Sequence, residues 1–340
     1  MSRIRSMLAV TAMALTSAVS TAQAHTPATR VATIKVHSAS IEGNLEGNSA
    51  DREVFVVMPP SYATQPKRRY PVVYFLHGFF ATAKNYMDGT KIAEGAAAAV
   101  KAGGQEMILV VPDSYTRHAG SLYSSSPTVG DFEGFITRDL VAYVDRHYRT
   151  LARPESRGLA GHSMGGYGTL RLAMKYPGIY SNIYAMSACC LAPRAPVVEQ
   201  LRPLADITLE QAATGDFMVR ATLSSAAAWS PAPEKPPLFL ETGLKTDGTI
   251  DPLVTAKWAA NAPLVMVAQS VPALKSLRAI AMDVGDKDPL LGSNEAVRDE
   301  LRRYGLQVQW EVYDGDHGNR IADRFQAKVL PFFSRQLKPQ

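Results

Sequence analysis

Cysteine is almost missing from this 340-residue sequence, since the only two are the neighbours Cys189 and Cys190. Adjacent cysteines can close only a strained ring, so the sequence contains no disulfide framework. We interpret both as small apolar residues of a packed segment.

Long hydrophobic runs are also missing, apart from one short stretch near the start. Arg3 and Arg5 precede an apolar run over 7–19, and the small-x-small motif AQA ends at residue 24. This pattern predicts that residues 1–24 are a secretory signal peptide, too short to span a membrane. We therefore expect a mature protein that begins at His25, is exported to the periplasm or the medium, and has no stable membrane insertion.

The sequence has only a small excess of positive over negative charge. The formal net charge is +5, and two of these charges are Arg3 and Arg5, which leaves +3 on the mature chain. No dense stripe of lysine and arginine exists, so we expect no nucleic-acid partner. The remaining composition, 46% apolar and 20% charged, is ordinary for a globular protein.

Short apolar runs alternate with longer stretches of helical periodicity. The runs predict strands over 54–59, 71–78, 107–113, 157–161, 183–188, 278–285 and 307–315. The periodic stretches predict helices over 131–148, 164–176 and 319–337. This alternation indicates an α/β fold with a mostly parallel central sheet that is flanked by helices.

Residues 190–275 interrupt the alternation with several proline-rich stretches and the apolar residues Phe217, Trp229 and Trp258. We interpret this region as an insertion between two sheet strands, so that residues 25–340 form one domain.

A serine stands among four glycines in the stretch LAGHSMGGYG. A predicted strand ends just before Ser163 and a predicted helix begins just after it. This is the context of a nucleophile elbow, a tight turn that lifts the serine oxygen above the sheet. Larger side chains would collide in such a turn, which accounts for Gly161, Gly165, Gly166 and Gly168.

A serine hydroxyl needs a base, and the base needs an orienting carboxylate, in the chain order Ser, Asp or Glu, His. Of seven histidines only His317 follows Ser163, and it lies between the last strand and the last helix. After the preceding strand, Asp286 and Asp288 are both candidates for the acid, and we favour Asp288. Asp283 lies within the strand, so we expect it to be structural.

Two backbone N–H groups should stabilise the oxyanion that acyl transfer creates. We expect one from Met164 and the other from the loop LHGFFA, where Phe79 is favoured and Phe80 is the alternative. We expect His77 to shape this loop through hydrogen bonds, and His162 to be a packing residue.

Four motifs carry a family resemblance: YPVVYFLHGF, GHSMGGYGTLRLAMKYP, DVGDKDPLL and GDHGN. Together they resemble the "Putative esterase" branch of the α/β-hydrolase superfamily. That branch includes esterase D (S-formylglutathione hydrolase), feruloyl and acetylxylan esterases, enterobactin esterases and antigen 85 mycolyltransferases. The similarity runs from about residue 50 to 335 and is weakest over 190–275.

The resemblance implies a catalytic triad of Ser163, Asp288 and His317, with Phe79 and Met164 at the oxyanion positions. The G-x-x-D pattern of the family, here ending at Asp288, supports this residue over Asp286. The same resemblance makes Glu133 structural, and implies that the inserted region helps to form a cap-like substrate pocket.

The leading hypothesis is a secreted serine carboxylic-ester hydrolase that acts on a small-molecule or carbohydrate-linked ester. No metal or organic cofactor is implied. One alternative is an acyltransferase that passes the acyl group to a sugar or lipid alcohol. Another is a non-catalytic binding protein on the same fold. The export signal argues against a cytosolic formaldehyde-detoxifying role, and the HGFF loop departs from the glycine-rich HGGG type.

Overall fold

The structure of this chain is a computed structural model that describes residues 29–340. The predicted signal peptide, residues 1–24, lies outside the described residues. Within the described part, no helix has the length and apolar character needed to cross a membrane.

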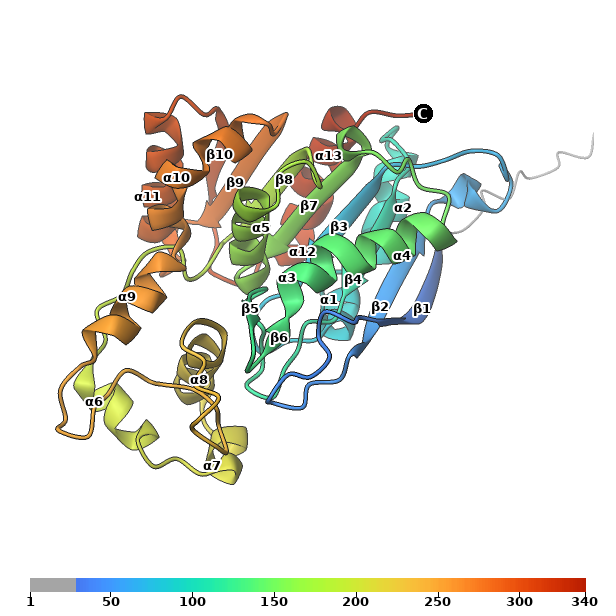
Figure 1. Ribbon diagram of the computed structural model, residues 1–340. Coiled ribbons are helices and arrows are strands. Elements are labelled where there is room, and N and C mark those ends of the chain that lie inside the picture. Colours follow the sequence, from blue (N-terminus) through green and yellow to red (C-terminus); the bar gives the residue numbers. More distant parts are fainter. Residues whose placement is uncertain (1–28) are drawn as a thin grey trace, which may run out of the picture.

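An eight-stranded sheet forms the centre of the molecule (Figure 1) in the order β1-β2-β4-β3-β7-β8-β9-β10. All neighbours from β4 to β10 are parallel, whereas β1 and β2 form an antiparallel edge. The strands are β1 Arg30–His37, β2 Asp51–Met58, β3 Val72–Leu76, β4 Ile108–Pro112, β7 Arg157–His162, β8 Asn182–Met186, β9 Ala279–Gly285 and β10 Val308–Tyr313. A separate two-stranded pair consists of β5 Ser125–Ser126 and β6 Gly130–Asp131.

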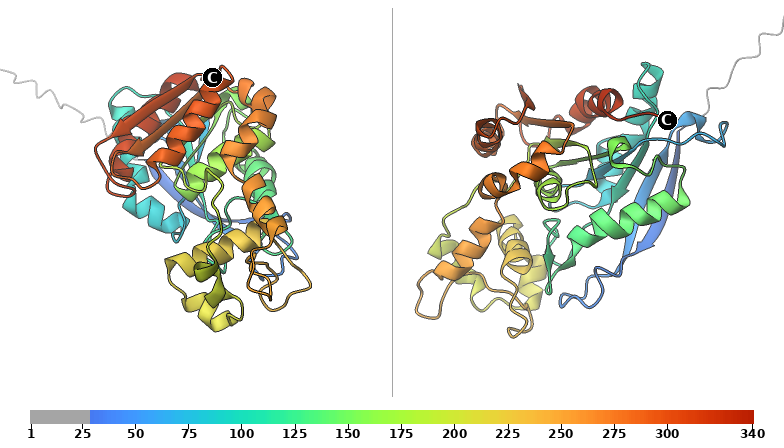
Figure 2. Two further views of the ribbon diagram at one scale, coloured as in Figure 1. Left: turned by 90° about the vertical axis from the view of Figure 1, so that its left-hand side faces the viewer. Right: turned by 45° about the horizontal axis from the view of Figure 1, so that its top comes forward.

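Helices cover both faces of the sheet, because each central strand is apolar on both sides (Figures 1 and 2). Val72 and Tyr74 face one layer, and Val73 and Phe75 face the other, as the two-residue period of a strand requires. The first layer holds α3 Phe132–Gly134, α4 Leu140–His147, α5 Met164–Lys175, α10 Pro263–Lys275 and α11 Leu291–Arg303. The second holds α1 Ala83–Gly89, α2 Ile92–Lys101, α12 Ile321–Arg324 and α13 Leu330–Gln336.

The predicted α/β fold with a mostly parallel sheet is confirmed. Each of the seven predicted strands is present, with ends shifted by a few residues. The predicted helices over 131–148 and 319–337 each contain a π-helical turn, at Phe135–Asp139 and Phe325–Val329. The sequence did not reveal β1, because this edge strand buries only one residue fully, Val36.

Residues 191–262, here called the helical segment, form a small layer beside the sheet, between β8 and β9 in the chain (Figures 1 and 2). It contains α6 Val198–Leu201, α7 Leu209–Thr214, α8 Phe217–Trp229 and α9 Pro252–Ala260. The segment has a small core of its own, built on Leu223 and Leu240. The predicted insertion over 190–275 was drawn too long, because α10 belongs to the main core, with Val267 and Leu274 packed in it.

Candidate active site

Ser163 occupies the turn between β7 and α5. Its backbone angles are φ 56° and ψ −114°, a region that costs an L-residue roughly 1–3 kcal/mol. Three backbone hydrogen bonds hold the turn in place. The Ser163 N–H donates to the carbonyl of Met186 (2.9 Å), and its own carbonyl accepts from Tyr167 (3.0 Å) and Cys189 (3.1 Å).

The glycines around Ser163 are required by close backbone contacts. A Cβ atom on Gly165 would lie 2.0 Å from the carbonyl oxygen of Leu76, and one on Gly161 would lie 2.4 Å from the backbone of Gly165. Both obstacles are main-chain atoms, which cannot rotate away. A Cβ on Gly166 or on Gly168 would meet the side chain of Ala188 or of Tyr123. The expected collision of larger side chains in this turn is therefore confirmed.

The three residues predicted as a triad lie in one hydrogen-bonded row. His317 Nε2 is 2.9 Å from Ser163 Oγ, and His317 Nδ1 is 2.9 Å from Asp288 Oδ2. A carboxylate only accepts hydrogen bonds, so His317 Nδ1 carries the proton and Nε2 accepts from the serine hydroxyl. This is the arrangement in which an imidazole can remove the serine proton.

Asp288 is buried, and its environment keeps it ionised. Burial by itself raises the pKa of a carboxyl group, but hydrogen bonds from His317 and from the Leu290 N–H outweigh this effect. The net result is that the pKa of Asp288 is lowered from its ordinary value. The carboxylate can therefore stabilise a positive charge on His317.

The other two aspartates of this region have structural partners. Asp286 Oδ1 accepts a hydrogen bond from the Gly315 N–H at 2.9 Å, which ties the two loops together. Asp283 is buried, accepts from Tyr184 and forms an ion pair with Arg324. The structure thus brings Asp288, and neither alternative, to the histidine.

His162 has a role that its position in the sequence did not reveal. Its Nε2 is 2.8 Å from the carbonyl oxygen of His317, and its Nδ1 is 2.6 Å from the hydroxyl of Tyr86. A carbonyl only accepts, so Nε2 donates to it and Nδ1 accepts from Tyr86. Burial lowers the pKa of His162 to about 3, so the ring stays neutral. His162 therefore positions the backbone of His317 in addition to packing beneath it.

His77 shapes the loop after β3, as the sequence predicted. The Ser114 N–H donates to His77 Nε2 at 2.8 Å, so Nδ1 carries the proton and donates to the Gly78 carbonyl at 2.8 Å. Burial lowers the pKa of His77, which keeps this neutral form.

The two backbone N–H groups expected to face the oxyanion are those of Phe79 and Met164. Within residues 29–340 neither group donates a hydrogen bond, and Met164 is the first residue of α5, where N–H groups have no partner inside the helix. The Phe80 N–H, in contrast, donates to the Ala119 carbonyl at 3.0 Å. Phe80 is therefore not available for this task.

Glu133 is structural, as predicted. Its buried carboxylate forms ion pairs with Arg171 and Lys175 and accepts a hydrogen bond from Tyr176. These partners join α3 to α5 and lie away from the triad.

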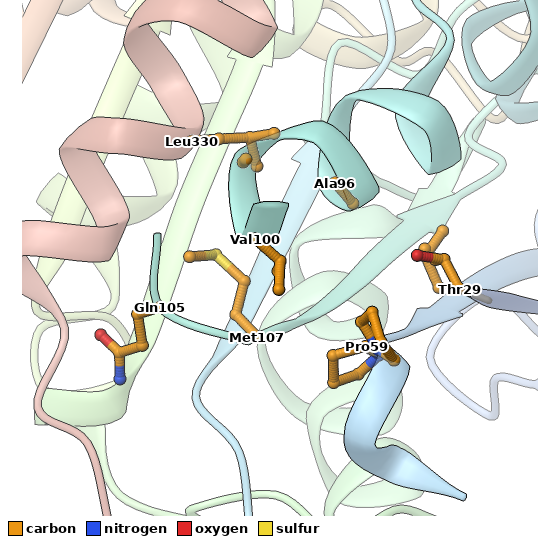
Figure 3. Close-up of a pocket in the computed structure, with 10 residues that line it drawn as sticks. Thr29, Pro59, Ala96, Val100, Gln105, Met107 and Leu330 are labelled. Carbon is orange, nitrogen blue, oxygen red and sulfur yellow. The ribbon is translucent and has the colours of Figure 1, made fainter. Parts of the chain in front are cut away.

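Two hollows differ in position and size. One, of about 180 Å³, lies in the helical segment between Cys190, Arg194, Trp229 and Trp258. Cys189, the neighbour of Cys190 in the chain, donates its N–H to the carbonyl of Ser163 in the elbow. The other hollow, of about 10 Å³, lies between Pro59, Val100 and Leu330 (Figure 3), and no residue of the triad lines it. It has room for about one water molecule and lacks titratable side chains, so it is a packing defect.

An aromatic cluster borders the loop after β3. The ring of Phe217, from the helical segment, lies 5.5 Å from the ring of Phe79 and 6.0 Å from that of Phe80. The guanidinium of Arg220 covers Phe80 at 4.7 Å. Phe80 and Phe217 are 44% and 57% exposed, so they offer an apolar surface beside the expected oxyanion site.

A family model described as "Putative esterase" matches residues 48–330. Over 135 residues the chain is 36% identical to Esterase Rv1288 and to Esterase MT1326, both from Mycobacterium tuberculosis. This match covers 38% of the chain and 27% of each relative, so it spans about a quarter of their length.

Solved structures with a similar fold cover nearly the whole chain. A ferulic acid esterase has a TM-score of 0.67 at 23% identity, covering 91% of this chain and 99% of that one. A fluorophosphonate-binding serine hydrolase F from Staphylococcus aureus has a TM-score of 0.63 at 17% identity, covering 90% and 99%. An S-formylglutathione hydrolase from Agrobacterium tumefaciens has a TM-score of 0.60 at 16% identity, covering 91% and 96%.

Proposed function

Because the chain belongs to the "Putative esterase" family, we propose that it is an exported serine carboxylic-ester hydrolase whose acyl-enzyme forms on Ser163. The observation that carries this proposal is the hydrogen-bonded row of Asp288, His317 and Ser163. An ordinary surface serine has neither a strained backbone nor a histidine ring nitrogen 2.9 Å from its hydroxyl.

In the acylation step, Ser163 Oγ attacks the ester carbonyl while His317 Nε2 takes its proton. The imidazolium is stabilised by the ionised Asp288. The N–H groups of Phe79 and Met164 donate to the oxygen that gains negative charge. His317 then gives the proton to the departing alcohol, and the acyl group stays on Ser163.

In the deacylation step, His317 takes a proton from water, which attacks the acyl-enzyme and releases the acid. His162 supports both steps, because its hydrogen bond to the His317 carbonyl fixes the backbone of the base. The aromatic rings of Phe80 and Phe217 favour an ester with an aryl or medium-length apolar group, bound at the rim of the site.

Export rests on the pattern over residues 1–24, a charged start, an apolar run and a cleavage motif. Fractionation of cells that express the full chain tests it. We expect the protein outside the cytoplasm with His25 as its first residue. Cytoplasmic protein that still begins at Met1 would contradict this part.

The first experiment compares the mature chain with Ser163→Ala on p-nitrophenyl and hydroxycinnamoyl esters. We expect kcat to fall by roughly 10⁴-fold or more, since the nucleophile is lost. Ser276→Ala, which changes an exposed serine at the end of α10, is the matched control and should keep full activity. A fluorophosphonate probe should label Ser163 in the wild type and leave the variant unmodified.

Equal activity of wild type and Ser163→Ala would show that Ser163 is not the nucleophile. If the acyl group passes to an added sugar or lipid alcohol in preference to water, the enzyme is an acyltransferase. The proposal that water is the acyl acceptor would then be wrong.

A further inference from the structure

The cysteine pair lies directly behind the elbow. Cys189 and Cys190 follow β8, and the Cys189 N–H donates to the carbonyl of Ser163 at 3.1 Å. The two sulfur atoms are 2.9 Å apart. The pair is thus in mutual contact at a point one hydrogen bond away from the backbone of the proposed nucleophile.

The pair is also accessible. Both cysteines are half-buried, and Cys190 forms part of the wall of the hollow in the helical segment. Arg194 lines the same hollow and places a positive charge near the two thiols. Reactive cysteines are found in such partly exposed and electropositive surroundings, whereas inert structural cysteines are fully buried among apolar groups.

The two thiols are not equivalent. The hydrogen bond from Cys189 lowers the pKa of Cys190, burial opposes this effect, and Arg194 assists it, with a net lowering. The Cys189 thiol has a raised pKa, chiefly through the same hydrogen bond and through burial. Cys190 also lines the hollow, where a small disulfide can enter, and Cys189 does not. Cys190 is therefore the better source of a thiolate, and Cys189 is placed to react second.

We propose that Cys189 and Cys190 form a redox-active vicinal dithiol, a modification site at which a small disulfide converts the two thiols into a Cys189–Cys190 bridge and thereby weakens ester binding. The effect on ester binding rests on the proposed function, but formation of the bridge does not.

The exchange balances in two steps. The Cys190 thiolate attacks one sulfur of the small disulfide, which forms a mixed disulfide and releases one small thiolate. The Cys189 thiol then loses its proton and attacks Cys190 Sγ, which closes the bridge and releases the second small thiolate. The protein loses two protons and two electrons, that is two hydrogen atoms, and the small disulfide becomes two thiols.

The bridge should be easily reversed. Neighbouring residues hold their Cα atoms closer together than the roughly 4.4–6.8 Å of ordinary disulfides, and strained disulfides are readily reduced. Closing the ring draws Cys190 toward Cys189 and changes the wall of the hollow. The same wall includes Met218, the neighbour of Phe217 at the proposed ester-binding rim. The triad loops are not part of the ring, so KM should change more than kcat.

The experiment uses the mature chain, treated with oxidised glutathione or with dithiothreitol. The chain has no cysteine besides this pair, so the thiol count is unambiguous. We expect a monomer that has lost two hydrogens, retains no titratable thiol and binds no glutathione. Phenylarsine oxide, which needs two neighbouring thiols, should bind the reduced wild type only.

Two variants separate the roles of the thiols. Cys189→Ser should stop at the mixed disulfide on Cys190, and Cys190→Ser should react slowly with oxidised glutathione because the remaining Cys189 does not line the hollow. For the wild type, oxidation should raise the KM of the preferred ester several-fold, and dithiothreitol should restore it. Cys190→Ser should show the same KM in both buffers.

Each unfavourable outcome has its own meaning. Free thiols, dimers or two glutathione adducts after oxidation would overturn the dithiol site. A bridge that leaves KM and kcat unchanged would overturn its effect on the ester site. Activity that survives Ser163→Ala would overturn the proposed function and leave the mass result intact.

Discussion

The triad loops and the helical segment are held in place by different forces. The loops that carry Ser163, Asp288 and His317 follow three parallel strands and are fixed by buried backbone hydrogen bonds and backbone contacts. The helical segment has a separate small core and carries five of the nine exposed large apolar side chains of the described chain. They are Val197, Leu209, Phe217, Met218 and Leu253.

This difference indicates a division of labour. A rigid scaffold can hold reacting atoms within the fractions of an ångström that proton transfer requires. A separate layer with exposed apolar side chains can bind different esters without disturbing the triad. Changes at the triad loops should therefore alter kcat or folding, and changes in the helical segment should alter KM or substrate preference.

The largest effect is expected from Asp288→Asn compared with Asp286→Asn. The first change removes the charge and the tautomer control of His317, so kcat should fall by about 10⁴-fold. The second keeps an oxygen acceptor for the Gly315 N–H, and kcat should stay near the wild-type value. Steady-state kinetics on one p-nitrophenyl ester measures both. A larger loss for Asp286→Asn would reassign the acid.

The next effect concerns folding of the elbow. Gly165→Ala places a methyl group against the Leu76 carbonyl, and we expect a loss of about 3 kcal/mol or more in the free energy of unfolding. Gly292→Ala in α11 is the matched control, because a Cβ there meets no atom within 4 Å. It should stabilise the protein by about 0.5–1 kcal/mol. Urea titration measures the free energy of unfolding of both variants. Equal stability of the two would refute the close-contact explanation.

The titration of His162 makes the free energy of unfolding depend on pH. The pKa of His162 in the folded protein, about 3, lies below the ordinary histidine value of 6.5. The unfolded chain therefore binds the proton more readily. The stability that His162 contributes is present above about pH 6.5 and is lost as the pH falls toward 3.

His162→Gln removes this titration while a side-chain N–H can still donate to the His317 carbonyl. Between about pH 7 and pH 5, the variant should lose about 2 kcal/mol less stability than the wild type. Urea unfolding at the two pH values measures the difference. An identical pH dependence of both proteins would mean that the ring is not held neutral.

The smallest effect is expected in the helical segment. Phe217→Ala removes a ring that contacts Phe79 and Phe80, so KM for an aryl ester should rise by an amount worth about 0.5–1.5 kcal/mol. Its kcat should stay unchanged. Leu253→Ala, at an exposed position outside the hollow and the aromatic cluster, is the control and should alter neither constant. A fall in kcat comparable to that of Asp288→Asn would break the proposed division of labour.

Much of the fold could be predicted from the sequence because it depends on local patterns. Apolar runs and helical periodicity located seven strands and the helix after the elbow, and the glycines around Ser163 located the tight turn. The edge strand β1 and the boundary of α10 were missed, because both depend on which neighbour a half-apolar stretch packs against.

The sequence by itself determined the elbow, and it identified His317 as the single histidine after Ser163. Only the tertiary structure decided between Asp286 and Asp288, because a hydrogen bond depends on where two loops meet. For the same reason the sequence did not reveal the hydrogen bond from His162 to the carbonyl of His317, two residues that are 155 positions apart. This reason also explains why the sequence suggested a packed segment for Cys190, whereas the structure places this residue in the wall of a hollow. The sequence records neighbours in the chain, and only folding creates neighbours in space.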